Sequence, residues 1–118
     1  MFQDFPIGKG RILALIEKTT FSFNSTQQAV YLNDIDLKLR ESDYIILKFL
    51  YENRNTPQLR LDILNQFKQL VGGNWNEIND YNLNIVSQHI NTIRKKILVV
   101  APGFRPIITL PQKYQFRE

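Results

Sequence analysis

Apolar residues recur at spacings of three and four between positions 83 and 97, a pattern that predicts an amphipathic helix. The apolar positions are Leu83, Val86, Ile90, Ile93 and Ile97. At 100° per residue these side chains share one narrow face, which we expect to pack on the core. With its flanking residues the helix spans about residues 80–98.

Two shorter helical patterns precede this helix. The first spans residues 42–53 and stops at a cluster of Asn, Thr and Pro residues. The second spans residues 61–70, and the Gly72-Gly73 pair after it is a stop signal. The residues of this second helix expected to face inward are Ile63, Leu64, Phe67, Leu70 and Val71.

Short segments rich in β-forming residues lie on both sides of the helices. Before them the segments cover residues 11–16, 20–23, 29–32 and 35–39, with turn-forming residues between. After them the segments cover residues 106–110 and 113–116, separated by Pro111-Gln112. The fold class predicted is therefore α+β, with an N-terminal antiparallel sheet, three helices and a C-terminal β-hairpin.

The length of 118 residues suits one domain. We expect residues 1–19 to form an N-terminal arm with an extra strand, and residues 20–118 to form the domain itself. No apolar run approaches the roughly 18 residues of a membrane span. The absence of cysteine excludes a disulfide framework and a thiolate metal site, and it fits a reducing compartment such as the cytoplasm.

The positive charge is concentrated at one end of the chain. From Arg94 onward there are six cations against Glu118 alone, or +5, whereas residues 1–93 hold nine cations and ten anions, or −1. The whole excess of positive charge therefore lies at the end of the amphipathic helix and in the residues that follow it. Such a local basic patch attracts a polyanion, although a basic end can also serve solubility alone.

The polar face of the same helix carries amide, hydroxyl and cationic groups and no carboxylate. Its members are Asn84, Ser87, Gln88, Asn91, Thr92, Arg94 and Lys95. Asn and Gln can pair bidentately with an adenine edge in the major groove of DNA, and Lys and Arg neutralise phosphates. The alternative is the ordinary solvated face of an amphipathic helix.

Three fragments of the chain resemble one family. Residues 86–97 (VSQHINTIRKKI) are similar to the recognition helix of the OmpR/PhoB-type winged-helix domain, residues 39–47 to its first helix, and residues 107–116 to its wing. The segment from Phe23 to Leu32 resembles the ToxR/CadC-like branch. The resemblance covers about residues 20–117 and implies a winged helix-turn-helix fold.

The resemblance implies a bacterial, sequence-specific DNA-binding transcriptional regulator. Its recognition helix, residues 80–98, would enter the major groove of double-stranded DNA, and its wing, about residues 106–117, would touch the adjacent backbone or minor groove. The partners it implies are a second copy on DNA, RNA polymerase or a sensor protein. If the native protein is longer, the domain would act at the inner membrane.

Each candidate contact has an expected role. The base contacts expected are Gln88, Asn91 and Thr92, with Asn84 near the helix start and Ser87 at the flank. Arg94 matches the family's phosphate-clamping arginine. The further DNA contacts expected are Lys95, Lys96, Arg105 and the wing-tip residues Gln112 and Lys113. Lys96 has the alternative of lying along the core edge, and His89 either contacts a phosphate or packs under the helix.

Four departures from the family pattern stand out. Arg40 replaces the usual Thr at the N-cap of the first helix, where Ser42 or Asp43 can cap one turn later. The loop at residues 68–82 is longer than usual and its role is open, and either Phe67 or Trp75 fills the family's Trp position. The wing lacks the Arg-Gly-x-Gly turn.

Two other functions remain open. One is a protein-binding winged-helix adaptor, which predicts an exposed apolar patch, although the polar face offers little except Ile85. The other is the cytoplasmic fragment of a membrane-anchored regulator. No nucleophile accompanies the carboxylates and a single histidine makes a poor metal site, so we expect no enzyme, no metal and no cofactor.

Overall fold

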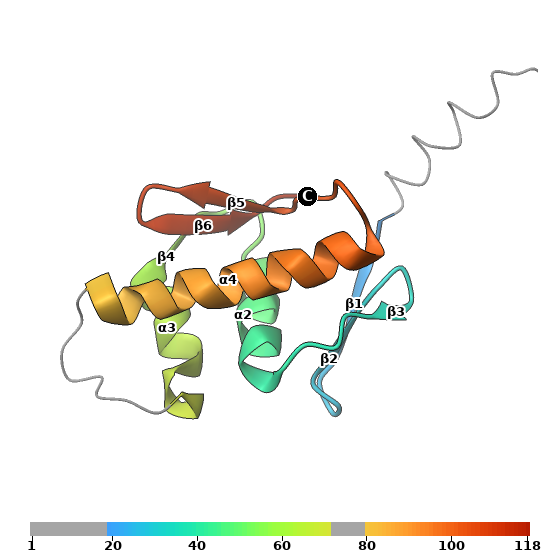
Figure 1. Cartoon of the computed structure of the whole chain (residues 1–118), viewed down its shortest axis with the longest axis horizontal. Coiled ribbons are helices and arrows are strands. Elements are labelled where there is room, and N and C mark those ends of the chain that lie inside the picture. The colour runs from blue at the N-terminus through green and yellow to red at the C-terminus, as the bar shows by residue number, and fades with distance from the viewer. Residues whose placement is uncertain (1–18, 72–79) are drawn as a thin grey trace, which may run out of the picture.

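The computed structural model describes residues 19–71 and 80–118. In chain order the elements are β1 (Phe21–Asn24), β2 (Ala29–Leu32), β3 (Ile35–Asp36), α2 (Glu41–Glu52), β4 (Gln58–Leu59), α3 (Arg60–Phe67), the 3₁₀ turn η1 (Lys68–Leu70), α4 (Asp80–Val100), β5 (Ile107–Leu110) and β6 (Lys113–Phe116). Figure 1 shows α4 running across α2 and α3, with the β5–β6 hairpin along one side. The predicted α+β class, with its N-terminal sheet, three helices and terminal hairpin, is confirmed.

The N-terminal sheet is antiparallel in the order β1-β2-β3. Asn33 and Asp34 link β2 to β3 with φ values of 52° and 67°, which suits a two-residue type I′ hairpin. The third strand is two residues long, so the predicted extent of 35–39 was wrong. It ends early because the Lys38 backbone N–H donates to the Asp36 side chain at 2.7 Å, and Lys38 itself has a φ of 57°.

The core lies between the three helices and the two sheets. The predicted stripe of α4 is buried: Val86, Ile90, Ile93 and Ile97 have no exposed surface, and Leu83 packs against the core partly buried. The stripe meets the buried residues of α2 and α3, which are Asp43, Tyr44, Ile46, Leu47, Leu50, Ile63, Leu64 and Phe67. The periodicity of α4 therefore predicted its packing face correctly.

Leu70 was predicted to face the core, and that prediction was wrong because Leu70 is 48% exposed. The α-helix ends at Phe67, and the chain continues as a 3₁₀ turn over Lys68–Leu70. A 3₁₀ turn has three residues per turn, so the spacing that continues an α-helical face no longer applies.

The first turn of α2 is stabilised differently from a standard cap. Arg40 occupies the N-cap and makes no side-chain hydrogen bond there. Asp43, one of the two candidates for a later cap, is 1% exposed, and its carboxylate lies 2.8 Å from His89 Nδ1 on α4. Its carboxylate thus joins two helices.

The wing is a three-stranded sheet in the order β4-β6-β5. Strand β4 was not predicted, because two residues are too few to show an alternating pattern. Pro111 and Gln112 turn the chain between β5 and β6, and Gln112 has a φ of 59°. The Arg60 backbone N–H donates to the Gln112 carbonyl at 3.1 Å, so the hairpin tip is attached to the start of α3.

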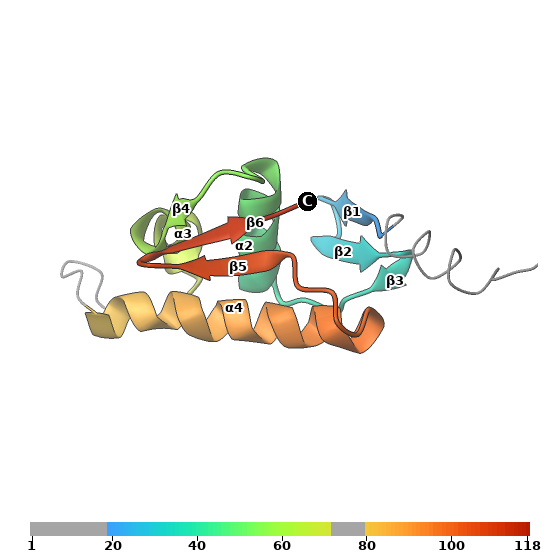
Figure 2. The same cartoon turned by 90° about the horizontal axis from the view of Figure 1, so that it is seen from above.

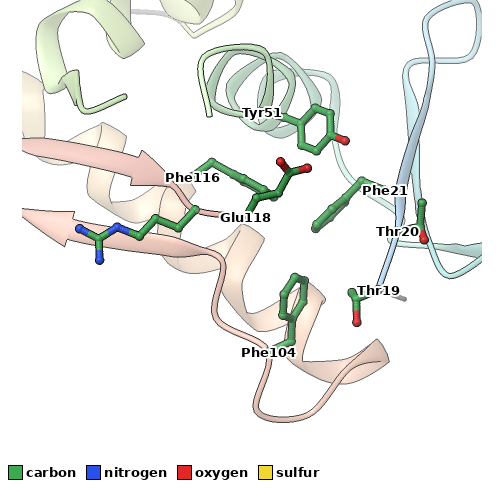
Figure 3. A pocket seen from close by; sticks show the side chains of 8 residues that line it. Thr19, Thr20, Phe21, Tyr51, Phe104, Phe116 and Glu118 are labelled. Atoms are coloured by element: carbon green, nitrogen blue, oxygen red, sulfur yellow. The ribbon is translucent and has the colours of Figure 1, made fainter. Parts of the chain in front are cut away.

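An aromatic cluster joins the N-terminal sheet to the wing. Phe21 of β1 meets Phe116 of β6 edge-on with ring centroids 5.3 Å apart, and Tyr51 of α2 meets the same ring at 5.2 Å. Phe104 lies 6.0 Å from Phe21. A cavity of about 470 Å³ opens beside these rings (Figure 3); it is lined by Thr19, Thr20, Phe21, Tyr51, Phe104, Phe116, Arg117 and Glu118.

Some sequence predictions lie outside the described residues. They concern the N-terminal arm, the strand at residues 11–16, the stop at Gly72-Gly73 and the placement of Trp75.

Seen from above, α4 and the wing hairpin lie along each other for much of their length (Figure 2).

Candidate nucleic-acid interface

The surface of α4 opposite its buried stripe is polar. Asn84, Gln88, Asn91, Thr92 and Lys95 are all exposed there. These five positions repeat at spacings of three and four, so they lie in one row along the helix axis. The row combines amide and hydroxyl hydrogen-bonding groups with a cation, and the sequence from residue 82 to residue 100 contains no acidic residue.

The exposed row contains side chains available for a ligand. The side chains of Gln88, Asn91 and Lys95 make no hydrogen bond or ion pair with another residue in the described part of the chain. Thr92 differs, because its hydroxyl donates to the Gln88 backbone carbonyl at 3.1 Å. Its oxygen keeps acceptor capacity.

One edge of α4 faces the wing instead of solvent. Ser87 Oγ lies 2.7 Å from the Tyr114 hydroxyl of β6. Arg94 Nη2 donates to the Ile107 carbonyl at 2.9 Å and to Thr109 Oγ1 at 2.6 Å, both on β5. Ser87 and Arg94 were predicted as DNA contacts beside the exposed row, and the structure places both in the contact between helix and wing.

The environment of Arg94 is partly desolvated. Burial lowers the pKa of its guanidinium, nearby Tyr114 acts to raise it, and the like charge of Arg105 lowers it further. The net direction is downward. Arginine starts so far above neutrality that the group still carries its charge at physiological pH. Arg94 is therefore a cation held between the wing and a second arginine.

His89 packs under the helix, one of the two roles proposed for it from the sequence. Its ring meets Phe67 edge-on at 4.9 Å, and its Nδ1 lies 2.8 Å from Asp43 Oδ1. This short contact is a hydrogen bond that joins α4 to α2 through the two side chains. The alternative role, a phosphate contact, stays a prediction for the remaining edge of the ring.

We expect Asp43→Ala to lower the free energy of unfolding by about 1–3 kcal/mol, because it removes the hydrogen-bond partner of His89 Nδ1 in a partly buried site. Thermal or urea denaturation followed by circular dichroism measures the change. Glu41→Ala is the matched control: Glu41 is exposed in the same first turn, so it shares only the helix-dipole effect of about 0.3–1 kcal/mol. Equal losses in the two variants would contradict a stabilising role for the contact.

The remaining cations differ in their surroundings. Lys96 Nζ donates to the Lys38 carbonyl at 2.5 Å, so its ammonium group already has a protein partner. That its side chain lies along the core edge stays a prediction. Arg105 and Lys113 are exposed. Gln112 is exposed too; its side-chain oxygen accepts from Arg60 Nη2, which leaves its amide nitrogen as the donor for a contact with DNA.

Sequence reasoning missed three residues that organise this surface. Tyr114 is 6% exposed and contacts both Ser87 and Arg94, Thr109 accepts from Arg94, and Asp43 orients His89. Of the three, only Tyr114 could have been noticed in the sequence, because it is an aromatic residue within a segment predicted to be a β-strand. The partners of all three are distant in the sequence.

The described residues contain no group of three or more His, Cys, Asp or Glu side chains that could hold a metal ion. Within the same ranges, no helix combines the length and the apolar character that crossing a bilayer requires.

No protein-family model matches the sequence, and no curated protein matches it. Solved structures do. The DNA-binding domain of the response regulator AdeR, solved with an intercistronic region, is 20% identical with a TM-score of 0.65, over 82% of this chain and 93% of that one. The DNA-binding domain of CpxR from E. coli is 16% identical with a TM-score of 0.64, over 82% and 89%. That of CadC from E. coli is 16% identical with a TM-score of 0.63, over 81% and 84%.

These likenesses show the fold, which is a winged helix. Membership of the OmpR/PhoB family stays a prediction. At 16–20% identity they show the arrangement of elements and not the function of this chain. The three TM-scores are nearly equal, so they do not separate the ToxR/CadC-like branch from the others. That finer assignment stays a prediction.

Proposed function

We propose that this chain is a sequence-specific DNA-binding transcriptional regulator that places α4 in the major groove of double-stranded DNA. The observation that carries the proposal is the exposed row on α4, in which two amide side chains stand beside a lysine and have no hydrogen-bond partner among the described residues. The fold supports it, because its solved relatives include DNA-binding domains. An α-helix fits the width of that groove.

The row divides into two kinds of contact. Gln88 and Asn91 are the principal base contacts, because amides can pair bidentately with adenine, and Thr92 and Asn84 extend the row at either side. Lys95, with Arg105 and Lys113 beyond the helix, contributes attraction to phosphates. The amide-rich row favours sites rich in A·T pairs. Equal affinity for A·T-rich and G·C-rich sites would rule that preference out.

A second copy of the chain is part of the proposal. One winged helix covers a modest area of DNA, so a single copy binds weakly and two copies on paired sites bind more strongly. RNA polymerase and a sensor protein are the further partners proposed. A regulator of this kind shares a compartment with the chromosome, so we place it in the cytoplasm.

The protein-binding alternative is less well supported. It requires an apolar patch on the exposed side of α4, and Ile85, the candidate for such a patch, is packed partly buried against the core. Val99 is 83% exposed on the same helix, but one isolated apolar residue is normal for a protein surface.

We expect salt-sensitive binding when fluorescence polarisation is measured with random and A·T-rich duplexes over a series of salt concentrations. If Lys95, Arg105 and Lys113 each neutralise one phosphate, the logarithm of the binding constant falls against the logarithm of salt with a slope of about −3. The A·T-rich duplex should bind more tightly at every salt concentration. No binding even at low salt would overturn the proposal and favour the protein-binding adaptor.

A further inference from the structure

Two arginines line a small cleft where α4 meets the wing. The cleft has a volume of about 150 Å³ and is lined by Arg94, Ile97, Leu98, Phe104, Arg105 and Pro106. We infer that the two arginines have separate tasks: Arg94 is a positioning residue that fixes the wing on α4, and Arg105 is the cation that meets a backbone phosphate beside the wing. The task of Arg105 rests on the proposed function, and the task of Arg94 can be tested without DNA.

The contacts of Arg94 reach both strands of the hairpin. Its Nη2 donates to the Ile107 carbonyl and to Thr109 Oγ1, which fixes β5. The carbon of its guanidinium lies 5.7 Å from the centre of the Tyr114 ring, which belongs to β6. A planar guanidinium can hold two acceptors and an aromatic ring at once, and a lysine ammonium offers no such fork.

The wing has a second attachment to α4, about two helical turns before Arg94. It is the hydrogen bond between Ser87 and Tyr114. Two attachments fix both the position of the hairpin and its angle relative to the helix. Without Arg94, β5 loses its side-chain hydrogen bonds to α4, whereas β6 stays held by Ser87 and by its pairing with β4. The β5 edge of the wing then no longer keeps its position beside the groove that α4 occupies.

Arg94 is poorly placed to clamp a phosphate, which is the role implied by the family resemblance. Both hydrogens of its Nη2 already point to protein acceptors. A phosphate would be limited to the hydrogens on Nη1 and Nε unless it displaced the carbonyl and the hydroxyl that lie within 3 Å of Nη2, and it would have to approach a guanidinium that is already partly desolvated. These contacts favour an internal role.

Arg105 has the opposite surroundings. It is exposed, and its side chain has no hydrogen-bond or ion-pair partner among the residues that the structure describes. It lines the same cleft as Arg94 and is close enough to lower the pKa of that residue. Two like charges at one cleft repel each other, and a phosphodiester oxygen beside Arg105 relieves that repulsion.

Amide hydrogen exchange of the DNA-free protein tests the positioning role. We expect Arg94→Lys, which keeps the charge, to speed exchange in β5 and β6 by roughly tenfold or more while exchange in α2 stays unchanged. Arg105→Gln should leave exchange in the wing unchanged. Wing exchange that is the same in Arg94→Lys and in the wild type would overturn the positioning role.

The salt dependence of DNA binding tests the division of tasks. Arg105→Gln should reduce the magnitude of the slope by about one unit, as expected for one lost phosphate contact. Arg94→Lys should keep the wild-type slope and reduce affinity. A slope reduced by about one unit in Arg94→Lys would show that Arg94 itself meets phosphate, and an unchanged slope in Arg105→Gln would overturn the role of Arg105. If the wild type does not bind DNA at all, the proposed function fails, and the exchange data still decide the task of Arg94.

Discussion

We expect the double substitution Gln88→Ala, Asn91→Ala to remove most of the sequence preference of DNA binding, an effect of about 2–6 kcal/mol if each amide discriminates by about 1–3 kcal/mol. Both side chains are exposed on α4 and make no hydrogen bond or ion pair with another part of the described chain, so their removal should leave the fold intact. The binding that remains should keep its salt dependence, because the cations that attract phosphate are unchanged.

Fluorescence polarisation with a preferred duplex and a scrambled duplex of equal composition measures this effect. The control is Asn65→Ala, Gln69→Ala, which removes two exposed amides from α3 and the 3₁₀ turn after it. The control should retain the ratio of the two affinities. A double variant of α4 that keeps the wild-type ratio would show that another surface discriminates between sequences.

The second large effect is expected in the core. Ile93→Ala should lower the free energy of unfolding by about 2–5 kcal/mol, because it opens a cavity among closely packed side chains. Ile93 has no exposed surface and belongs to the stripe of α4 that packs against α2 and α3. Since a marginally stable domain has only about 5–15 kcal/mol in total, this single change should lower the melting temperature by many degrees.

Val99→Ala provides the matched control for Ile93→Ala. Val99 lies on the same helix and is 83% exposed, so its truncation should change stability by about 0.5 kcal/mol or less. Urea denaturation of both variants measures the difference directly. Similar losses in the two variants would mean that α4 does not pack through the stripe described above.

The helices were predictable because a regular apolar period specifies which face of a helix is buried. The stripe from Val86 to Ile97 illustrates this, since the sequence alone specified it and the structure buries it. The same reasoning located the exposed row around Gln88 and Asn91. Whether that row contacts DNA is still a prediction, because burial and exposure do not report what an exposed side chain binds.

The contacts at the edges of α4 were not predictable from the period. A helical wheel placed Ser87 and Arg94 beside the exposed row, but their partners belong to the wing, a separate part of the chain. Asp43 looked like a helix cap for the same reason, because its partner His89 lies 46 positions away. Local patterns specify the direction of a side chain, and long-range packing decides what it meets.

The aromatic cluster between Phe21 and Phe116 has a consequence for how the domain folds. These two rings come from the first and last strands described, so their contact closes a loop that contains all three helices. Closing a long loop costs entropy before the contact can return any stability, and such topologies fold more slowly than helical bundles of similar size. We therefore expect the helices to associate early, and the N-terminal sheet to gain its stability in the final step, when β6 brings Phe116 to β1.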